Sequence, residues 1–378
     1  MGAPSGPEAD VFAPQPPTNP PPGAGRRLVR FLKEHPIICL ALLTPGIPEY
    51  LSTSSSLLTA VNNPIFFFLQ ISINVGQYTA GALLIREAVI RWHKGWGTVF
   101  VLGLAYGITE EGLGDATLFN ATHGTDGILG SFGRFAGVNW VWSTGVLAFH
   151  VIYSIGLPIL LLGLAVPWTR GRSLLGNRGI AVALATVVAT TSAEMVLVYG
   201  EDRFWLGWVL LVGCLVAIGL LVLLAYRAPA DLWTPSRLHS TLRPWQVGTI
   251  GFTFFPIALL LEYDLISDRV PAYVVILLEL LIFAAFLETM RRGIGRSQNE
   301  LLLVNLAMGF VVWQATFGVL LTLGFPYTLP LVALAVVFFL RLRRAYRGSD
   351  ASSVGDGPPH NSVLAGETAR RALQRGET

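Results

Sequence analysis

Two adjacent glutamates stand near the end of one strongly apolar run, and a histidine follows about 40 residues later in another. The first run ends in GLAYGITEEGLGD and contains Glu110 and Glu111, and the second contains His150. Carboxylates and an imidazole can hold a water molecule, act as general acid and base, or relay a proton. We therefore take Glu110, Glu111 and His150 as candidate catalytic residues.

The composition around these residues is that of a membrane protein. Of the 378 residues, 53% are hydrophobic and only 13% are charged, whereas soluble domains carry about a quarter charged residues. A net charge of +3 gives no indication of a nucleic-acid partner. The two cysteines lie far apart, so neither a disulfide framework nor a cysteine metal site is expected. The expected partners are the lipid bilayer and a peptide or small-molecule substrate.

Helices that cross a hydrocarbon core of roughly 30 Å need about 20 apolar residues. The sequence predicts an all-α fold, a polytopic membrane bundle of about ten transmembrane helices, at 36–57, 64–85, 97–113, 139–166, 179–200, 204–226, 245–263, 271–290, 300–323 and 326–341. We expect a disordered Pro-rich tail over 1–35, a transmembrane domain over 36–342 and a second disordered tail over 343–378.

Basic residues alternate between the predicted loops. They gather before the first span and after the second, fourth, sixth, eighth and tenth spans, while the intervening loops carry few. Because cytoplasmic loops are enriched in Lys and Arg, both termini are expected to be cytoplasmic and the protein to lie in the cell membrane. Glu110 then stands roughly 20 Å above the start of its span, in the outer third of the bilayer.

Glu110 shares one helical face with Gly103, Gly107 and Gly114. Glycines let a neighbouring helix approach closely, so Glu110 is expected to point into the bundle and Glu111 to point about 100° away. The alternative is a glycine packing seam with a glutamate at its wet end. By straight helical rise, Glu110 and His150 would be separated by roughly 11 Å along the membrane normal. Contact between them then requires tilted helices or a bridging water.

Other spans carry polar residues at comparable depth, and interhelical hydrogen bonding is one explanation for them. Asn74 belongs to a stripe of amides with Gln70 and Gln77. The first span is broken by prolines just before a glutamate, and irregular backbone at this depth favours a wet cavity. We predict a substrate or proton pathway formed by Glu49, Asn74, Glu194 and Glu279.

A glutamate pair on one membrane helix with a histidine on the next resembles the CAAX-protease and bacteriocin-processing membrane family (CPBP). Glu110 and Glu111 match its glutamate pair, and His150 matches its second-motif histidine. The resemblance implies a multi-span helical fold and an intramembrane peptidase that activates water, with the role of a metal open. The chain departs at Asp115, an arginine in the family, and at Val146, a phenylalanine there; the third-motif histidine has no counterpart. The chain also looks like a set of uncharacterised prokaryotic membrane proteins.

Three functions remain open from the sequence. The first is an intramembrane hydrolase in which Glu110 acts as general base on a water held by Glu111 and His150. The second is a proton-coupled transporter or permease, because membrane acids and a histidine are common relay groups. The third is a non-catalytic assembly protein whose polar groups only join helices. The sequence leaves any cofactor or metal unknown.

The predicted orientation can be checked by labelling single cysteines with an impermeant thiol reagent. Cysteines introduced at Thr53, Asp126 and Asp268 should react from outside intact cells, because their loops carry few basic residues. Labelling from outside at Arg172 or Ser236 would reverse the assignment.

Overall fold

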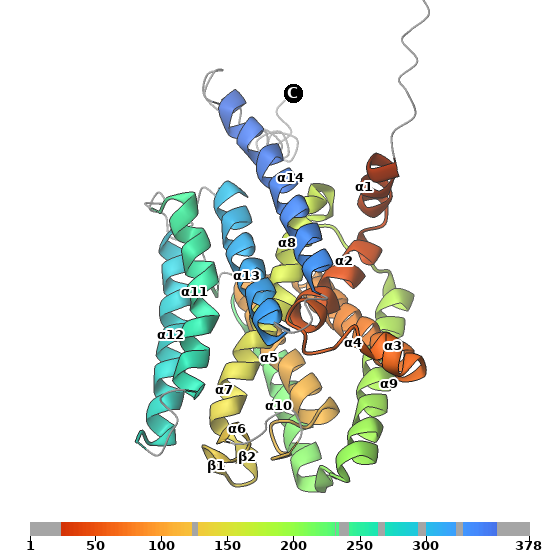
Figure 1. The fold of residues 1–378 in the computed structure, drawn as a ribbon, viewed down its shortest axis with the longest axis vertical. Helices are drawn as coiled ribbons and strands as arrows, with labels where there is room; N and C mark the ends of the chain where they lie inside the picture. Colours follow the sequence, from red (N-terminus) through yellow and green to blue (C-terminus); the bar gives the residue numbers. More distant parts are fainter. Residues whose placement is uncertain are drawn as a thin grey trace, which may run out of the picture.

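The protein is described by a computed structural model over residues 24–122, 128–230, 232–233, 242–263, 269–293, 300–322 and 328–353. The labelling positions Asp126, Ser236 and Asp268 lie outside these residues. The described chain is a helical bundle with one short hairpin (Figure 1). Its elements are α1 (Ala24–Glu34), α2 (Pro36–Pro45), η1 (Gly46–Leu51), α3 (Thr59–Asn62), α4 (Pro64–Arg91), α5 (Trp96–Gly107), η2 (Ile108–Gly114), α6 (Ile128–Ser131), β1 (Arg134–Phe135), β2 (Val138–Asn139), α7 (Trp140–Phe149), η3 (His150–Gly156), α8 (Leu157–Ala165), η4 (Pro167–Thr169), α9 (Asn177–Asp202), α10 (Gly207–Arg227), α11 (Pro244–Tyr263), α12 (Ala272–Gly293), α13 (Glu300–Leu321) and α14 (Leu329–Ser353).

Within these described ranges, 6 helices are long and apolar enough to cross a membrane. They are the continuous helix Trp140–Ala165 (α7, η3 and α8) and helices α9 to α13. The prediction of about ten spans is therefore supported for these six. The other four predicted spans contain helices, but none meets both the length and the hydropathy criterion. The helix of the first is broken near Leu51, and others carry polar or charged residues. The sidedness of the bundle stays a prediction.

The helical part extends past both ends of the predicted transmembrane domain. Helix α1 lies within the segment 1–35, where a disordered tail is predicted, and α14 continues past residue 342 to Ser353. Helix α1 is amphipathic, with exposed Val29 and Phe31 interspersed with basic residues. A helix of this kind suits a membrane surface, which explains why a basic and polar segment is ordered as a helix.

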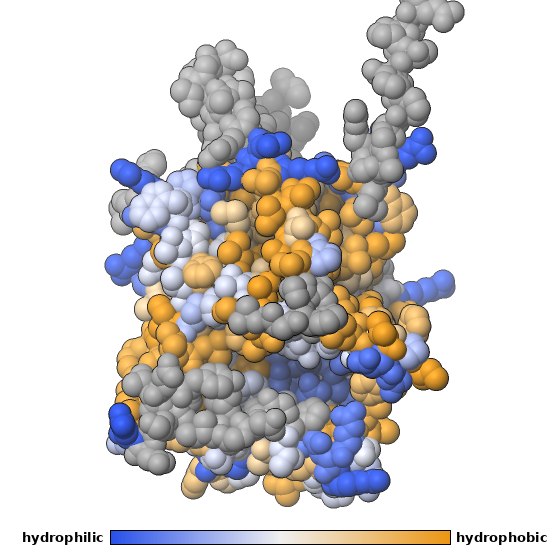
Figure 2. Space-filling view, viewed as in Figure 1, coloured by the Kyte–Doolittle hydropathy of each residue, from blue (hydrophilic) through white to orange (hydrophobic). Residues whose placement is uncertain are grey.

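The face of the molecule drawn in Figure 2 is largely apolar. Hydrophobic residues cover much of it, and hydrophilic residues lie at its upper end and in its lower half. Helix α10 is an extreme case, since its long hydrophobic side chains are largely exposed: Val209, Val212, Leu215, Val216, Leu220 and Leu224. Exposed apolar surface of this extent is stable only in contact with lipid or a partner. The structure thus agrees with a lipid bilayer environment.

Glycines set the spacing of the α11–α13 pair, which lie side by side in Figure 1. A Cβ added at Gly309 would lie 2.1 Å from the carbonyl oxygen of Gly248, and one at Gly251 would lie 2.6 Å from that of Leu306. The two backbones are therefore in direct contact, as is common between membrane helices. Behind them, aromatic side chains of η3, α11, α12 and α13 form the larger core, including Tyr153, Phe254, Phe286 and Phe310.

Three segments of the bundle are π-helical, and each continues an α-helix: η1 follows α2, η2 follows α5 and η3 follows α7. Such segments are rare and often occur at functional sites. The predicted break in the first span is confirmed here, because η1 begins at Gly46 and includes Pro48 and Glu49. The candidate catalytic residues lie in the other two, with Glu110 and Glu111 in η2 and His150 opening η3.

The close contact of α11 and α13 can be tested by adding one methyl group. Gly309→Ala should destabilise the protein by about 1–3 kcal/mol, because the new Cβ would overlap the backbone of Gly248. The matched control is Gly219→Ala on the exposed side of α10, where nothing lies within 4 Å of the added Cβ. Thermal denaturation of both variants in the same detergent is the measurement. Equal melting temperatures would show that the two helices are not in direct backbone contact.

Candidate functional site

The structure brings Glu110, Glu111 and His150 together. His150 Nε2 lies 2.8 Å from Glu110 Oε2 and 2.8 Å from Glu111 Oε1. All three side chains are buried. The nitrogen has at most one proton to donate, and the geometry favours Glu111 as the acceptor. Glu110 Oε2 is consequently a buried oxygen without a hydrogen bond among the described residues.

The relative depth of η2 and η3 is set by the loop that joins η2 to α7. The Trp142 indole donates to Thr117 Oγ1 at 3.0 Å, so these two residues lie at a similar depth in the bundle. Glu110 comes seven residues before Thr117, and His150 eight residues after Trp142. The two side chains therefore reach the same depth. The expected separation of roughly 11 Å is wrong because the contact of Thr117 with Trp142 leaves nearly equal lengths of chain on its two sides, and both glutamates reach His150 Nε2.

The predicted glycine face brings the helices close. A Cβ at Gly103 would lie 3.1 Å from Val151 Cα, and one at Gly107 would lie 3.3 Å from His150 Cβ. Helix α5 therefore lies directly against η3. Gly114 plays a different part, because it faces Glu194 of α9 rather than η3.

Glu111 does not point away from the site, so that prediction is wrong. It is in contact with His150 on one oxygen and accepts a hydrogen bond from the Thr117 hydroxyl on the other. The wide turn of a π-helix reduces the angle between successive side chains, which lets both glutamates face one histidine. On the far side of the ring, His150 Nδ1 lies 2.9 Å from Ser154 Oγ. Both ring nitrogens are thus engaged, which fixes the ring orientation.

Tyr78 of α4 connects this triad to a second carboxylate. Its hydroxyl lies 2.9 Å from Glu110 Oε1 and 2.6 Å from Glu49 Oε1. Ser55 donates to the other oxygen of Glu49 at 2.8 Å, and Asn74 donates to Ser55 at 3.1 Å. A continuous hydrogen-bonded chain therefore runs from η2 through α4 to η1.

Two more carboxylates, those of Asp115 and Glu194, lie close to Glu110. Glu194 of α9 accepts a hydrogen bond of 2.9 Å from Gln77 Nε2. Ligand atoms of Glu110, Asp115 and Glu194 lie within 4.8 Å of one another, as do those of Glu110, Glu111 and His150. Asp115 and Glu194 are only half-buried, whereas Glu110 is buried. The site thus has a buried centre and a more accessible rim.

Three of the four predicted pathway residues, Glu49, Asn74 and Glu194, reach this site. Glu279 does not join its hydrogen bonds. It is buried on α12, on the side of the bundle away from α4 and α9 (Figure 1). The helix that carries Glu279 was predicted correctly, but hydropathy does not indicate which other helices it contacts.

Sequence analysis missed Tyr78, Thr117 and Asp115 as participants. Tyr78 lies four residues after Asn74, so its position on the inward face of α4 was a usable signal. The amide stripe itself is confirmed, because Gln70, Asn74 and Gln77 all donate hydrogen bonds across helices.

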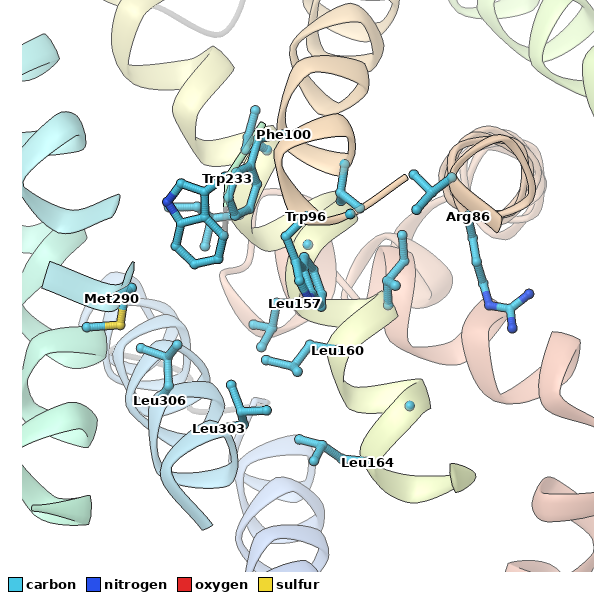
Figure 3. A pocket seen from close by; sticks show the side chains of 18 of the residues that line it. Arg86, Trp96, Phe100, Leu157, Leu160, Leu164, Trp233, Met290, Leu303 and Leu306 are labelled. Carbon is cyan, nitrogen blue, oxygen red and sulfur yellow. The ribbon is translucent and has the colours of Figure 1, made fainter. Parts of the chain in front are cut away.

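A large apolar cavity lies on the other side of η3. It measures about 390 Å³, and Figure 3 shows Trp96, Phe100 and Trp233 at one end of it with leucines of α8 and α13 along its walls. Val151 and Ile152 of η3 line this cavity, whereas His150 and Ser154 belong to the carboxylate site. The cavity can hold an apolar group, but the titratable residues described above meet elsewhere.

The bridging role of Tyr78 can be tested by deleting its hydroxyl. Tyr78→Phe should destabilise the protein by about 1–3 kcal/mol, because Glu49 and Glu110 each lose a hydrogen-bond partner. Tyr153→Phe is a matched control, since that buried hydroxyl has no hydrogen bond within the described residues. Thermal denaturation of the two variants compares them directly. A control variant that is as unstable as Tyr78→Phe would contradict the bridge.

Comparison with known proteins assigns a family. No curated protein and no solved structure matches the chain significantly. A model described as "Uncharacterized membrane protein family" matches residues 38–349, which include every residue of the site. This supports the resemblance to uncharacterised membrane proteins and gives no support to the CAAX-protease part of that prediction. The chain belongs to this uncharacterised membrane protein family.

Proposed function

We propose that the protein is a membrane-embedded hydrolase whose catalytic centre is Glu110, Glu111 and His150. The observation that carries the proposal is the convergence of two buried carboxylates on one imidazole nitrogen, each at 2.8 Å. Buried charges are costly, so such a cluster is retained in a membrane bundle where it does chemistry. Helix packing alone does not require buried carboxylates, because neutral amides and hydroxyls are sufficient to join membrane helices.

The geometry assigns a role to each residue. Ser154 and Thr117 hold His150 and Glu111 in place, and the pair leaves Glu110 Oε2 free to accept a proton. Glu110 takes a proton from a water molecule, whose oxygen forms a bond to the acyl carbon of the substrate. The bond between that carbon and the leaving nitrogen or oxygen then breaks, and Glu110 returns the proton to the leaving group. Glu111 and His150 orient the water.

The resemblance to the CAAX-protease family adds to this proposal at three positions only. Its glutamate pair and second-motif histidine fall on residues that meet in space. One of the departures from that family also lies at the site. Asp115 places a carboxylate at its rim where the family has an arginine. The substrate is therefore not taken over from the resemblance. The apolar cavity beyond η3 favours a substrate with a hydrophobic part.

Proton-coupled transport is the second candidate, favoured by one specific observation. Tyr78 connects Glu110 with Glu49, and Ser55 and Asn74 extend the connection toward η1 and α4. A hydroxyl between two carboxyl groups is a suitable element of a proton relay. Proton uptake by proteoliposomes, followed with an entrapped pH-sensitive dye, would distinguish this function from hydrolysis.

The hydrolase proposal is tested with purified protein in detergent and H₂¹⁸O. A panel of fluorogenic peptides, peptide amides and acyl esters serves as substrate, and mass spectrometry detects ¹⁸O in the product acid. Glu110→Gln, Glu111→Gln and His150→Ala should each lower turnover by about 100-fold or more, as expected for loss of a general base or its positioning groups. Glu111→Gln is included because its carboxylate contacts His150 directly.

Glu288→Gln is the matched control for loss of an acid. Glu288 forms ion pairs with Arg291 and Arg292 on α12 and takes no part in the site. This variant should keep full turnover. Unchanged turnover in both Glu110→Gln and His150→Ala would refute the hydrolase, and dye-detected proton flux without ¹⁸O incorporation would favour transport.

A further inference from the structure

Two groups of potential metal ligands in the bundle have one residue in common. Glu110, Glu111 and His150 form the first, and Glu110, Asp115 and Glu194 form the second. In each group the ligand atoms lie within 4.8 Å of one another. A divalent ion bound to carboxylate and imidazole at about 2.0–2.2 Å brings its ligands to separations of this order after small side-chain adjustments. The two groups thus share the Glu110 carboxylate.

The charge of the two groups requires compensation. Glu110, Glu111, Asp115 and Glu194 together carry four negative charges when ionised. Among the described residues, no Lys or Arg forms an ion pair with Glu110, Glu111 or Glu194. Isolated carboxylates cannot remain ionised in an apolar interior, so protons or cations must neutralise them. Divalent cations can neutralise Glu110, Glu111 and Glu194 while His150 stays neutral, the form in which imidazole binds metals.

Two further observations point to a ligand in the second group. Gln77 is buried, and its amide nitrogen donates to Glu194, but its amide oxygen Oε1 has no hydrogen bond within the described residues. A buried amide oxygen on a side chain whose nitrogen already contacts Glu194 is a ligand that hard cations accept. In addition, a Cβ at Gly114 would lie 2.0 Å from Glu194 Oε2. Only glycine therefore leaves room for that carboxylate beside η2.

We infer that the site binds two divalent cations, with the Glu110 carboxylate lying between them. The first is held by Glu111 and His150, and the second by Asp115 and Glu194. Four carboxylates and a histidine on neighbouring helices are a donor set that suits Mn²⁺, Fe²⁺ or Zn²⁺, and helical bundles use similar sets for paired metals. The inference rests on the proposed hydrolase site and changes one role in it: with Glu110 bound to both cations, the cations rather than the Glu110 carboxylate would activate the water. Paired cations about 3.5–4 Å apart can stabilise both the attacking and the leaving oxygen.

The metal inference is tested by Mn²⁺ binding, independently of any activity. Full-length protein is stripped with EDTA, loaded with Mn²⁺ and desalted. Elemental analysis should give about two Mn²⁺ per chain, and low-temperature EPR should show the signal of a coupled Mn²⁺ pair, since the ions are about 3.5–4 Å apart. An excess of Zn²⁺ should displace both ions.

Variants separate the two positions. Glu194→Gln should leave one Mn²⁺ with the six-line spectrum of an isolated ion, and Gly114→Ala should do the same without altering any ligand, because it displaces Glu194. Glu110→Gln should weaken both positions. Glu279→Gln is the matched control, a buried glutamate on α12 outside both groups, and should retain the pair. Melting temperatures of the metal-free variants check that each one is folded.

The outcomes are distinct from those of the hydrolase test. The inference would be overturned if the unmodified protein retained no more Mn²⁺ than Glu110→Gln. It would also be overturned if both Glu194→Gln and Gly114→Ala kept an unchanged Mn²⁺ pair. Hydrolysis by a protein that retains no Mn²⁺ after loading would overturn the inference while the proposed function stands. A coupled Mn²⁺ pair in a protein without hydrolytic activity would support the inference and count against the hydrolase.

Discussion

The cost of placing carboxylates inside an apolar bundle is the constraint on which the centre of this structure depends. Glu110 and Glu111 are buried, and Glu49, Asp115 and Glu194 are half-buried beside them. Outside water, each charge must be matched by hydrogen bonds, protons or cations. The surrounding polar residues meet this requirement from several helices at once: Tyr78 and Gln77 from α4, Thr117 from the loop after η2, and His150 and Ser154 from η3. Helices that share such a network cannot slide past one another without exposing an unpaired carboxylate.

The local backbone is adapted to the same end. Three π-helical segments occur where the polar residues meet, and η1 and η3 contact each other. A π-turn widens the helix and brings neighbouring side chains onto one face, which lets consecutive glutamates contact a single histidine. Glycines then allow the close approach that these short contacts need. Gly103 and Gly107 admit η3, and Gly114 admits Glu194.

The rest of the bundle separates this polar centre from lipid. Helices α9 and α10 present apolar side chains outward, and α11, α12 and α13 form an aromatic core with η3 on the other side. Helix η3 therefore has two different faces. One carries His150 and Ser154, and the other contributes Val151 and Ile152 to the apolar cavity (Figure 3).

The sequence alone determined the class of the protein and the identity of its central residues. Low charge and long apolar runs are sufficient for a helical membrane protein, because each span must be apolar to enter a bilayer. Glu110, Glu111 and His150 stood out because ionisable residues are rare in such runs. The inward face of Asn74 and the break before Glu49 were also readable, since both follow from helical spacing and from proline chemistry.

Tertiary structure decided which of these residues meet. The contact of Trp142 with Thr117 brings His150 to the depth of the glutamates. That register between the two helices does not follow from counting residues from the ends of the apolar runs. Helix α12 lies on the side of the bundle away from α4 and α9, which separates Glu279 from Glu194 although both are glutamates within apolar helices. Tyr78 becomes central only because α4 lies between η1 and η2 carboxylates. Hydropathy reports the preference of a segment for lipid, whereas the neighbours of a helix depend on side-chain packing between segments distant in the chain, and that information is not periodic in the sequence.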